Sequence, residues 1–341
     1  MLTCSINNIL NNELKIIDII TCLSAQEDQV DELFIAADKT RKKYVGNDIH
    51  LRALIEIGNY CRCDCLYCGI RASRNSIERY RLKKEEIIGL GNMAYSLGYR
   101  SVVLQGGEDP MFTKNLIGNI IRGIKINDMA VTLSLGDRSE DDYRYWKRCG
   151  ADRYLLRIET TNDELYHRLH PNGNLEQRKK NIYLLKKLGY QLGSGIMIGL
   201  PGQTMEMAAT DIIWLKNEAN AEMLGIGPFI PHYDTPLKNA SGGTLFQALK
   251  LIAVLRLVFK SAHIPATTAL GALAADGREQ ALSVGANVIM PNITPVRNRQ
   301  QYEIYPGKLY NIDDAERDKE LLEELALKSG RKIALDKGDT L

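Results

Sequence analysis

RALIEI (52–57) is followed directly by GNYCRCDCLYCGIR (58–71). An apolar strand thus leads into a cysteine-rich loop, and the pattern of the following residues shows in which fold this loop lies. The strand is the first of several short apolar, β-branched runs, which alternate with longer amphipathic helical patterns. The expected strands lie at 52–57, 101–105, 130–135, 153–158, 191–199, 221–227, 264–270 and 286–291. The expected helices lie at 84–97, 114–126, 139–149, 163–169, 174–189, 204–219, 243–261 and 276–284. Eight strand–helix units in series predict an α/β protein of the (βα)8 TIM-barrel class.

An open, doubly wound sheet is the alternative to a barrel. The dinucleotide-binding fingerprint G-x-G-x-x-G that such a sheet normally carries is missing from the loop at 58–69. Helical patterns precede the first strand, so we expect an N-terminal helical extension, then the barrel, then a charged helical tail. The expected boundaries are 1–47, 48–310 and 311–341, with the N-terminal helices at about 5–22 and 26–44.

The composition is that of an ordinary globular protein, with 45% apolar and 25% charged residues among 341. The 44 basic and 42 acidic side chains leave a net charge of +2, which gives no electrostatic case for a nucleic-acid surface. The most apolar stretch, 249–260, contains Arg256 and is too short to cross a bilayer. The N-terminus lacks the features of a signal peptide. We therefore expect a cytoplasmic protein without nucleic-acid or membrane partners.

The seven cysteines are unevenly placed, with four of them inside 61–68. An odd number without a secretory signal argues against a disulfide framework, so the group is expected to bind metal or to be redox-active. Cys61, Cys65 and Cys68 have the spacing C-x3-C-x2-C, which can hold three irons of a cubane cluster and leave the fourth iron open. With Cys63 included, the four thiols can instead form a closed zinc or iron–sulfur site. Alternation of side chains is expected to point Cys63 away from its neighbours.

Glycine and hydroxyl residues gather after the next two strands, at the end of a barrel where active sites lie. LQGGEDP (104–110) offers two glycines for close backbone approach and the Glu108 carboxylate as an acceptor. Thr132 and Ser134 share one face of the third strand by its period of two. Their hydroxyls can contact a cofactor or a substrate, or can satisfy the barrel interior.

Charged residues follow the fourth strand. Arg157 and Glu159 share one face by the same period and are expected to project into the barrel. Buried charges at strand ends need partners, which favours a functional site over packing. Arg178, at the start of a helix, can form a bidentate pair with a carboxylate such as that of methionine.

The cysteine spacing resembles that of the radical S-adenosylmethionine (SAM) enzymes. This resemblance implies two cofactors, a [4Fe-4S] cluster on the three cysteines and SAM on the unique iron. It implies that Tyr67 is the aromatic residue whose backbone contacts the adenine. It also implies that Gly106, Gly107 and Glu108 form the motif that binds the methionine amino group.

Seven further segments, from about residue 50 to residue 308, resemble the HydE family, the radical SAM maturases of the FeFe-hydrogenase H-cluster. They are VLQGGEDP, VTLSLG, ADRYLLR, GLPGQT, GIGPFIPH-DTPL, IPATTA and GANVIMPN. The resemblance implies that SAM is bound by Tyr67, Gly106, Gly107, Glu108, Ser134, Glu159 and Arg178. It implies that the substrate cavity is lined by Thr132, Arg157, Thr267, Thr268, Met290, Tyr302 and Tyr305.

The activity that this likeness implies is reductive cleavage of SAM to methionine and a 5′-deoxyadenosyl radical. The radical attacks the sulfur of a cysteine-bound iron carbonyl–cyanide synthon, an organometallic small molecule made by a partner maturase. The product feeds assembly of the diiron subcluster. The implied partners are a low-potential electron donor and the other hydrogenase maturases.

Some family members carry a second cluster near the C-terminus, but no cysteine follows Cys149, so that cluster is not expected here. Ile158 stands where the family is expected to have histidine, and it should face away from the barrel interior. A methylornithine synthase-like mutase is the close alternative. Biotin synthase would need further barrel cysteines. A non-enzymatic iron–sulfur carrier or zinc-binding module would leave Glu108, Arg157 and Glu159 without a purpose.

Overall fold

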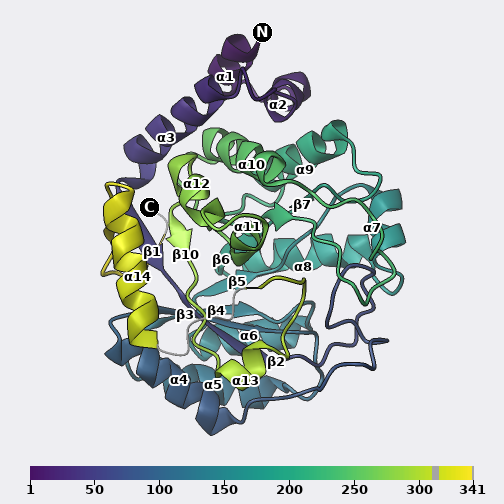
Figure 1. Cartoon of the computed structure of the whole chain (residues 1–341). Coiled ribbons are helices and arrows are strands. Elements are labelled where there is room, and N and C mark those ends of the chain that lie inside the picture. Colours follow the sequence, from purple (N-terminus) through teal and green to yellow (C-terminus); the bar gives the residue numbers. More distant parts are fainter. Residues whose placement is uncertain (309–314, 340–341) are drawn as a thin grey trace.

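The computed structural model describes residues 1–308 and 315–339. At its centre is a sheet of six parallel strands in the spatial order β2-β3-β4-β5-β6-β8. The strands are β2 (Ala53–Gly58), β3 (Ser101–Gly106), β4 (Ala130–Ser134), β5 (Arg153–Leu155), β6 (Gln191–Ser194) and β8 (Met223–Leu224). The helices between them lie on the outside of the sheet (Figure 1) and are α4 (Lys84–Ser96), α5 (Lys114–Lys125), α6 (Glu140–Arg148), α7 (Asp163–Leu169), α8 (Leu175–Lys187) and α9 (Met205–Asn217).

Short polar side chains fix where most of these helices begin. In each case a side-chain oxygen of the N-cap residue accepts a hydrogen bond from a backbone N–H of the first turn, which has no partner within the helix. The residues that do this before α5, α6, α7, α8 and α9 are Thr113, Ser139, Asn162, Asn174 and Thr204. The helix starts are therefore encoded locally.

The remaining strands, together with isolated bridges from Met223 to His263 and from Pro265 to Val288, close the sheet into a ring. β1 (Asp48–Leu51) and β2 are one extended segment interrupted at Arg52. β1 pairs in parallel with β10 (Val288–Ile289), whereas β2 pairs with β3. β7 (Met197–Ile198) and β9 (Gly227–Pro228) form a further parallel pair. The predicted TIM-barrel-like α/β fold is thus confirmed.

The seventh predicted strand, at 264–270, differs from the prediction. This segment contributes only an isolated bridge, between Pro265 and Val288, and helix α11 (Thr268–Leu273) begins inside it. Pro265 has no N–H to continue a ladder, and Thr267 is the N-cap of the new helix. Two further short helices follow on this side, α12 (Gly277–Ser283) and α13 (Val296–Arg299).

Three helices precede β1, namely α1 (Leu2–Leu10), α2 (Ile16–Leu23) and α3 (Asp31–Val45). The single helix expected at 5–22 is two helices because Asn12 adopts a left-handed backbone, with φ of 64°. These helices pack against the buried helix α10 (Leu245–Val258) (Figure 1). Arg256 of α10 is buried there because its guanidinium donates to the carbonyls of Gly285, Lys260 and Ala262.

Beyond the barrel, α14 (Ala315–Lys328) leads to a short strand, β11 (Lys332–Ile333), which pairs in parallel with β1. Helix was expected in this tail, whereas the strand was not. In the part of the chain that the structure describes, no helix combines the length and apolar character needed to cross a membrane.

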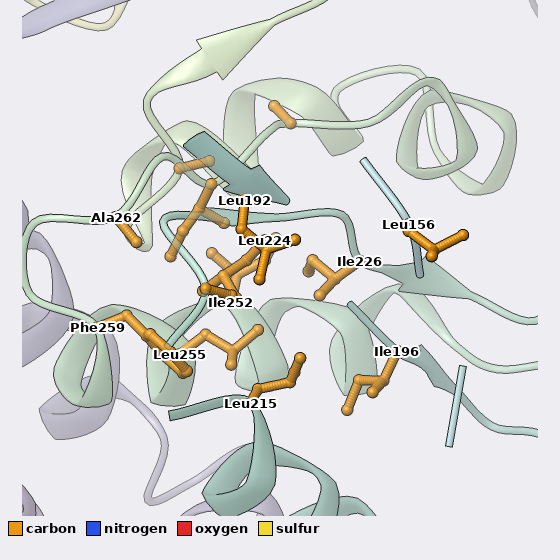
Figure 2. Packing of buried hydrophobic residues seen from close by; sticks show 14 of the residues in the cluster. Leu156, Leu192, Ile196, Leu215, Leu224, Ile226, Ile252, Leu255, Phe259 and Ala262 are labelled. Carbon is orange, nitrogen blue, oxygen red and sulfur yellow. The ribbon is translucent and has the colours of Figure 1, made fainter. Parts of the chain in front are cut away.

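The main core lies between the strands and the outer helices. Leu192, Leu224 and Ile226 point outward and pack against α9 and α10, where they meet Leu215 and Ile252 (Figure 2). Because side chains alternate along a strand, the residues between them face the barrel interior. The interior face carries the polar residues described next.

Candidate active site

The cysteine loop leaves the carboxyl end of β2 without regular secondary structure. Cys61, Cys65 and Cys68 are free thiols. The sulfur of Cys61 accepts hydrogen bonds from the backbone N–H groups of Cys63 and Glu108, each at 3.4 Å. A hydrogen bond with the Cys63 thiol, together with these N–H groups, lowers the pKa of Cys61 to about 7. Burial raises the pKa of Cys68 to about 12.

Cys63 does not point away from its neighbours, so that prediction was wrong. Its thiol hydrogen-bonds to Cys61, and this contact together with burial raises the pKa of Cys63. Strand alternation does not apply because this loop is not a strand, and the N–H of Cys63 turns back to donate to the sulfur of Cys61 at 3.4 Å. Among the described residues, no three His, Cys, Asp or Glu side chains converge closely enough to hold a single metal ion.

Two glycines let the next loops approach the cysteines closely. A Cβ on Gly107, just after β3, would lie 2.3 Å from the carbonyl oxygen of Tyr60 and 2.6 Å from Cβ of Cys61. A Cβ on Gly136, after β4, would lie 2.1 Å from Cγ of Glu108, and its φ is +70°. Only glycine fits either position. The loop after β3 therefore packs directly against the cysteine loop at Gly107, and the loop after β4 packs against Glu108 at Gly136.

Glu108 and Arg178 meet at this point, as the resemblance implied. Oε1 of Glu108 lies 3.5 Å from Nη2 of Arg178 and accepts the backbone N–H of Asp137 at 2.8 Å. Nε of Arg178 pairs with Oδ2 of Asp137 at 2.8 Å. Burial alone would lower the pKa of Arg178, but the carboxylates of Asp137 and Glu108 raise it. Asp137 was not among the predicted site residues, although it directly follows the VTLSLG segment.

Arg157 and Glu159 both project into the barrel, and Nη2 of Arg157 lies 2.9 Å from Oε2 of Glu159. The two atoms form an ion pair but not an aligned hydrogen bond. Nε of Arg157 is likewise buried without a hydrogen-bond partner. Burial raises the pKa of Glu159. Its backbone is left-handed, with φ of 64°, a strained conformation for a residue with a side chain that clusters at functional sites. Ile158 faces the outer core, as expected.

Tyr67 is anchored by His170, which sequence reasoning missed. The Tyr67 hydroxyl lies 2.8 Å from Nε2 of His170, whose Nδ1 lies 2.8 Å from the carbonyl oxygen of Tyr166. Burial lowers the pKa of His170 to about 4, so the ring is neutral near pH 7. This network assigns the proton to Nδ1, and Tyr67 then donates to Nε2. A histidine just after a helix, far along the chain from Tyr67, gives no signal by itself.

The other predicted residues lie on strands and loops of the barrel, except Thr268, which is the first residue of α11. The buried hydroxyl oxygens of Thr132 and Thr267 have no hydrogen-bond partner. Thr268 and Tyr305 share a hydrogen bond between their hydroxyl groups. Tyr302 is buried, whereas Ser134, the last residue of β4, and Met290, directly after β10, are half-buried. Buried polar atoms normally find partners, so the unpartnered atoms in this interior, with three free thiols beside them, fit a polar ligand and a cluster.

Comparison with known proteins agrees with this geometry. Residues 55–215 match the model of the radical SAM superfamily. The chain is 48% identical over 279 residues to the [FeFe] hydrogenase maturase subunit HydE of Thermotoga maritima, covering 82% of this chain and 80% of that protein. The chain belongs to the HydE family of radical SAM enzymes. For this family a [4Fe-4S] cluster and SAM are implied cofactors.

More distant members of the superfamily resemble this HydE-family chain in structure as well. The 3-methylornithine synthase of Methanosarcina acetivorans is 28% identical over 267 residues, 77% of this chain and 75% of that protein. The crystal structure of methylornithine synthase (PylB) superposes with a TM-score of 0.83 at 26% identity, over 97% of both chains. The chain is therefore an enzyme, and the carrier and zinc-module alternatives are set aside.

Proposed function

We propose that this enzyme acts in maturation of FeFe-hydrogenase, on a cysteine-bound iron carbonyl–cyanide complex that becomes part of the diiron subcluster of the H-cluster. The observation that carries the proposal is the 48% identity to the Thermotoga maritima HydE over most of both chains. The substrate, the order of steps and the partners belong to the proposal. The expected partners are a low-potential electron donor and the other hydrogenase maturases.

Cys61, Cys65 and Cys68 would hold three irons of a [4Fe-4S] cluster, and SAM would take the fourth. When both are bound and the cluster is reduced, they supply a 5′-deoxyadenosyl radical. The N–H groups that point at the sulfur of Cys61 stabilise its thiolate, which is the form that binds iron.

Charged residues beside the loop would bind the methionine end of SAM. Glu108 would accept the amino group, and Arg178 would pair with the carboxylate. Asp137 fixes the guanidinium of Arg178 at 2.8 Å, so the donor is already oriented. We assign Gly106, Gly107, Ser134, Glu159 and Tyr67 to the same cofactor.

Deeper residues would bind the substrate. Nε of Arg157 and the hydroxyl oxygens of Thr132 and Thr267 are buried without hydrogen-bond partners, which fits a ligand that carries cyanide and carboxylate acceptors. The wall of this chamber would be completed by Thr268, Met290, Tyr302 and Tyr305.

The test is an anaerobic exchange in a defined hydrogenase-maturation mixture. The reconstituted protein replaces the HydE component, and hydrogen evolution is measured with and without SAM. We expect activation that depends on SAM. If the hydrogenase stays inactive while 5′-deoxyadenosine forms, the radical chemistry stands and the substrate assignment is wrong.

One observation favours a second candidate, a mutase acting on an amino acid. The methylornithine synthase structure matches 97% of both chains. A lysine-type substrate that increases 5′-deoxyadenosine formation, in a protein that fails the exchange, would select this candidate.

A further inference from the structure

A buried ion pair inside the barrel belongs to none of the roles assigned so far. Side chains alternate along β2, and Ile55 and Ile57 pack in the outer core. Glu56 lies between them, so it faces the barrel interior, and its side chain is 0% exposed. It stands five residues before the first cysteine of the loop.

The partner of Glu56 is Lys308, from the far end of the barrel sequence. The ammonium of Lys308 contacts Oε1 of Glu56, and the lysine side chain is 4% exposed. The same ammonium donates to the carbonyl of Tyr302 at 3.2 Å and lies 4.8 Å from the centre of its ring. Two opposite charges in contact offset part of the cost of burying each of them.

The backbone of Glu56 is also fixed, but its side chain is not fully satisfied. Its N–H donates to the hydroxyl of Thr294 at 2.8 Å, and its carbonyl accepts the Tyr80 hydroxyl at 3.0 Å. The second carboxylate oxygen, Oε2, is buried without a hydrogen-bond partner. A buried acceptor left in this state costs about 1–3 kcal/mol, so it calls for a donor.

Glu56 lies in the barrel interior beside residues assigned to SAM and, through Lys308, beside Tyr302 of the proposed substrate chamber. In the sheet register Glu56 stands beside Gln105, which stands beside Ser134. Burial raises the pKa of Tyr305 to about 12, with a further raising contribution from Glu56 and a lowering one from Arg157. The acceptor on β2 and the guanidinium after β5 therefore act on one tyrosine of the proposed chamber wall.

We propose that Glu56 is a substrate-binding residue whose free oxygen accepts a hydrogen bond from the amino group of the substrate cysteine, and that Lys308 positions it. The inference rests on the proposed function, since that substrate contains an amino acid. An ionised carboxylate can only accept, so it selects an N–H donor. Arg157 can only donate, so it would take the carboxylate end of the same amino acid.

The probe is a synthetic cysteine-bound iron carbonyl–cyanide complex, titrated anaerobically into reconstituted protein. Infrared bands of the carbonyl and cyanide groups measure the bound fraction. In the double variant Glu56→Gln/Lys308→Met both charges are removed together, so neither is left buried alone. We expect the dissociation constant to rise at least about tenfold, as for loss of one charged hydrogen bond. Lys308→Arg keeps the positive charge and should bind within about threefold of the wild type.

Lys186→Met/Glu222→Gln is the matched control, because it removes an ion pair of 2.6 Å on the outside of the barrel. Iron content and SAM affinity report whether each variant is folded and loaded. If the double variant does not incorporate iron, Glu56→Asp replaces it. This variant keeps the negative charge but moves the carboxylate oxygen away from the substrate, and we expect the same rise in the dissociation constant.

The outcomes separate the two proposals. Wild-type protein that does not bind the complex contradicts the proposed function and this inference together. Wild-type binding with equal binding by the Glu56 variants contradicts this inference alone. Equal weakening in the control pair would also overturn it, because the loss would then not be specific to Glu56.

Discussion

Single side chains decide whether the cysteine loop can carry a cluster. Cys65 has no substitute, because the one loop thiol outside the proposed ligand set, that of Cys63, is hydrogen-bonded to Cys61. We expect Cys65→Ala to abolish iron incorporation and SAM cleavage, and Cys63→Ser to leave both nearly intact. Iron analysis and electron paramagnetic resonance of the reduced protein check this. A Cys65→Ala protein that binds iron and cleaves SAM would contradict the cluster assignment. Loss of iron in Cys63→Ser would show that the set of cluster ligands is different.

Arg178 is the residue on which the proposed SAM site depends most. It is held by Asp137 at 2.8 Å and lies 3.5 Å from Glu108. We expect Arg178→Met to weaken equilibrium SAM binding by about tenfold or more, because one bidentate charged partner is lost. Arg144→Met, which removes an exposed pair with Glu140 on α6, is the control and should bind SAM normally. Equal SAM affinity in both variants would remove Arg178 from the site.

His170 makes the stability of the protein depend on pH. Burial lowers its folded pKa to about 4, below the ordinary value of 6.5, so the folded state disfavours the proton. The stabilisation is complete above pH 6.5 and is lost as the pH falls from 6.5 towards 4. Linkage gives a loss of about 2 kcal/mol between pH 7.5 and pH 5. His170→Gln keeps an acceptor for Tyr67 and should show a smaller fall in unfolding free energy over this range. An unchanged pH slope in that variant would assign the effect to other groups.

At the level of elements, the loop after β3 depends on the absence of a side chain at Gly107. A Cβ there would meet the cysteine loop at 2.3 Å, and backbone atoms cannot move aside cheaply. We expect Gly107→Ala to destabilise the protein by about 1–3 kcal/mol and to reduce iron loading. Gly89→Ala in α4 has open space around its Cβ and should stabilise slightly. Thermal unfolding and iron content separate the two, and full iron loading in Gly107→Ala would contradict the close approach.

The elements also show what the sequence can and cannot predict. Periodicity located the helices from α4 to α10 closely, because each has a buried apolar face and most have a side-chain N-cap. It failed at 264–270, where the apolar and β-branched pattern is that of a strand but Pro265 and Thr267 start a helix instead. It also missed β11, a two-residue strand that pairs only because β1 offers an edge.

Some residues of the candidate site could be predicted from the sequence, and others could not. Local motifs pointed to the cysteines, Glu108 and Glu159, because each stands in a short recognisable segment. Asp137, His170 and Lys308 have roles that arise only when distant segments meet. Lys308 follows Glu56 by 252 positions, and no local pattern joins them.

At the scale of the whole molecule, the proposed catalytic residues and a set of stabilising contacts lie at opposite ends of the barrel. The cysteine loop lies at the carboxyl ends of the strands, whereas Arg52 and Arg153 are buried at the opposite ends. The C-terminal segment crosses this floor. Arg153 donates to the carbonyl of Lys337 at 2.7 Å and pairs with Asp339 at 2.6 Å, and Arg52 donates to the carbonyl of Gly338 at 3.1 Å.

Removing residues 335–341 should therefore weaken the fold and spare the site. Two buried guanidinium groups would lose acceptors, and such losses cost about 1–3 kcal/mol each. We expect the thermal midpoint to fall by several degrees, at about 2–4 °C per kcal/mol for a chain of this size. Asp339→Asn should have a small effect, because that side chain is 68% exposed. Iron content and SAM binding at 25 °C should match the full chain, since the floor lies at the other end of the strands from the cysteines. Loss of iron at that temperature would mean that the two ends of the barrel are coupled.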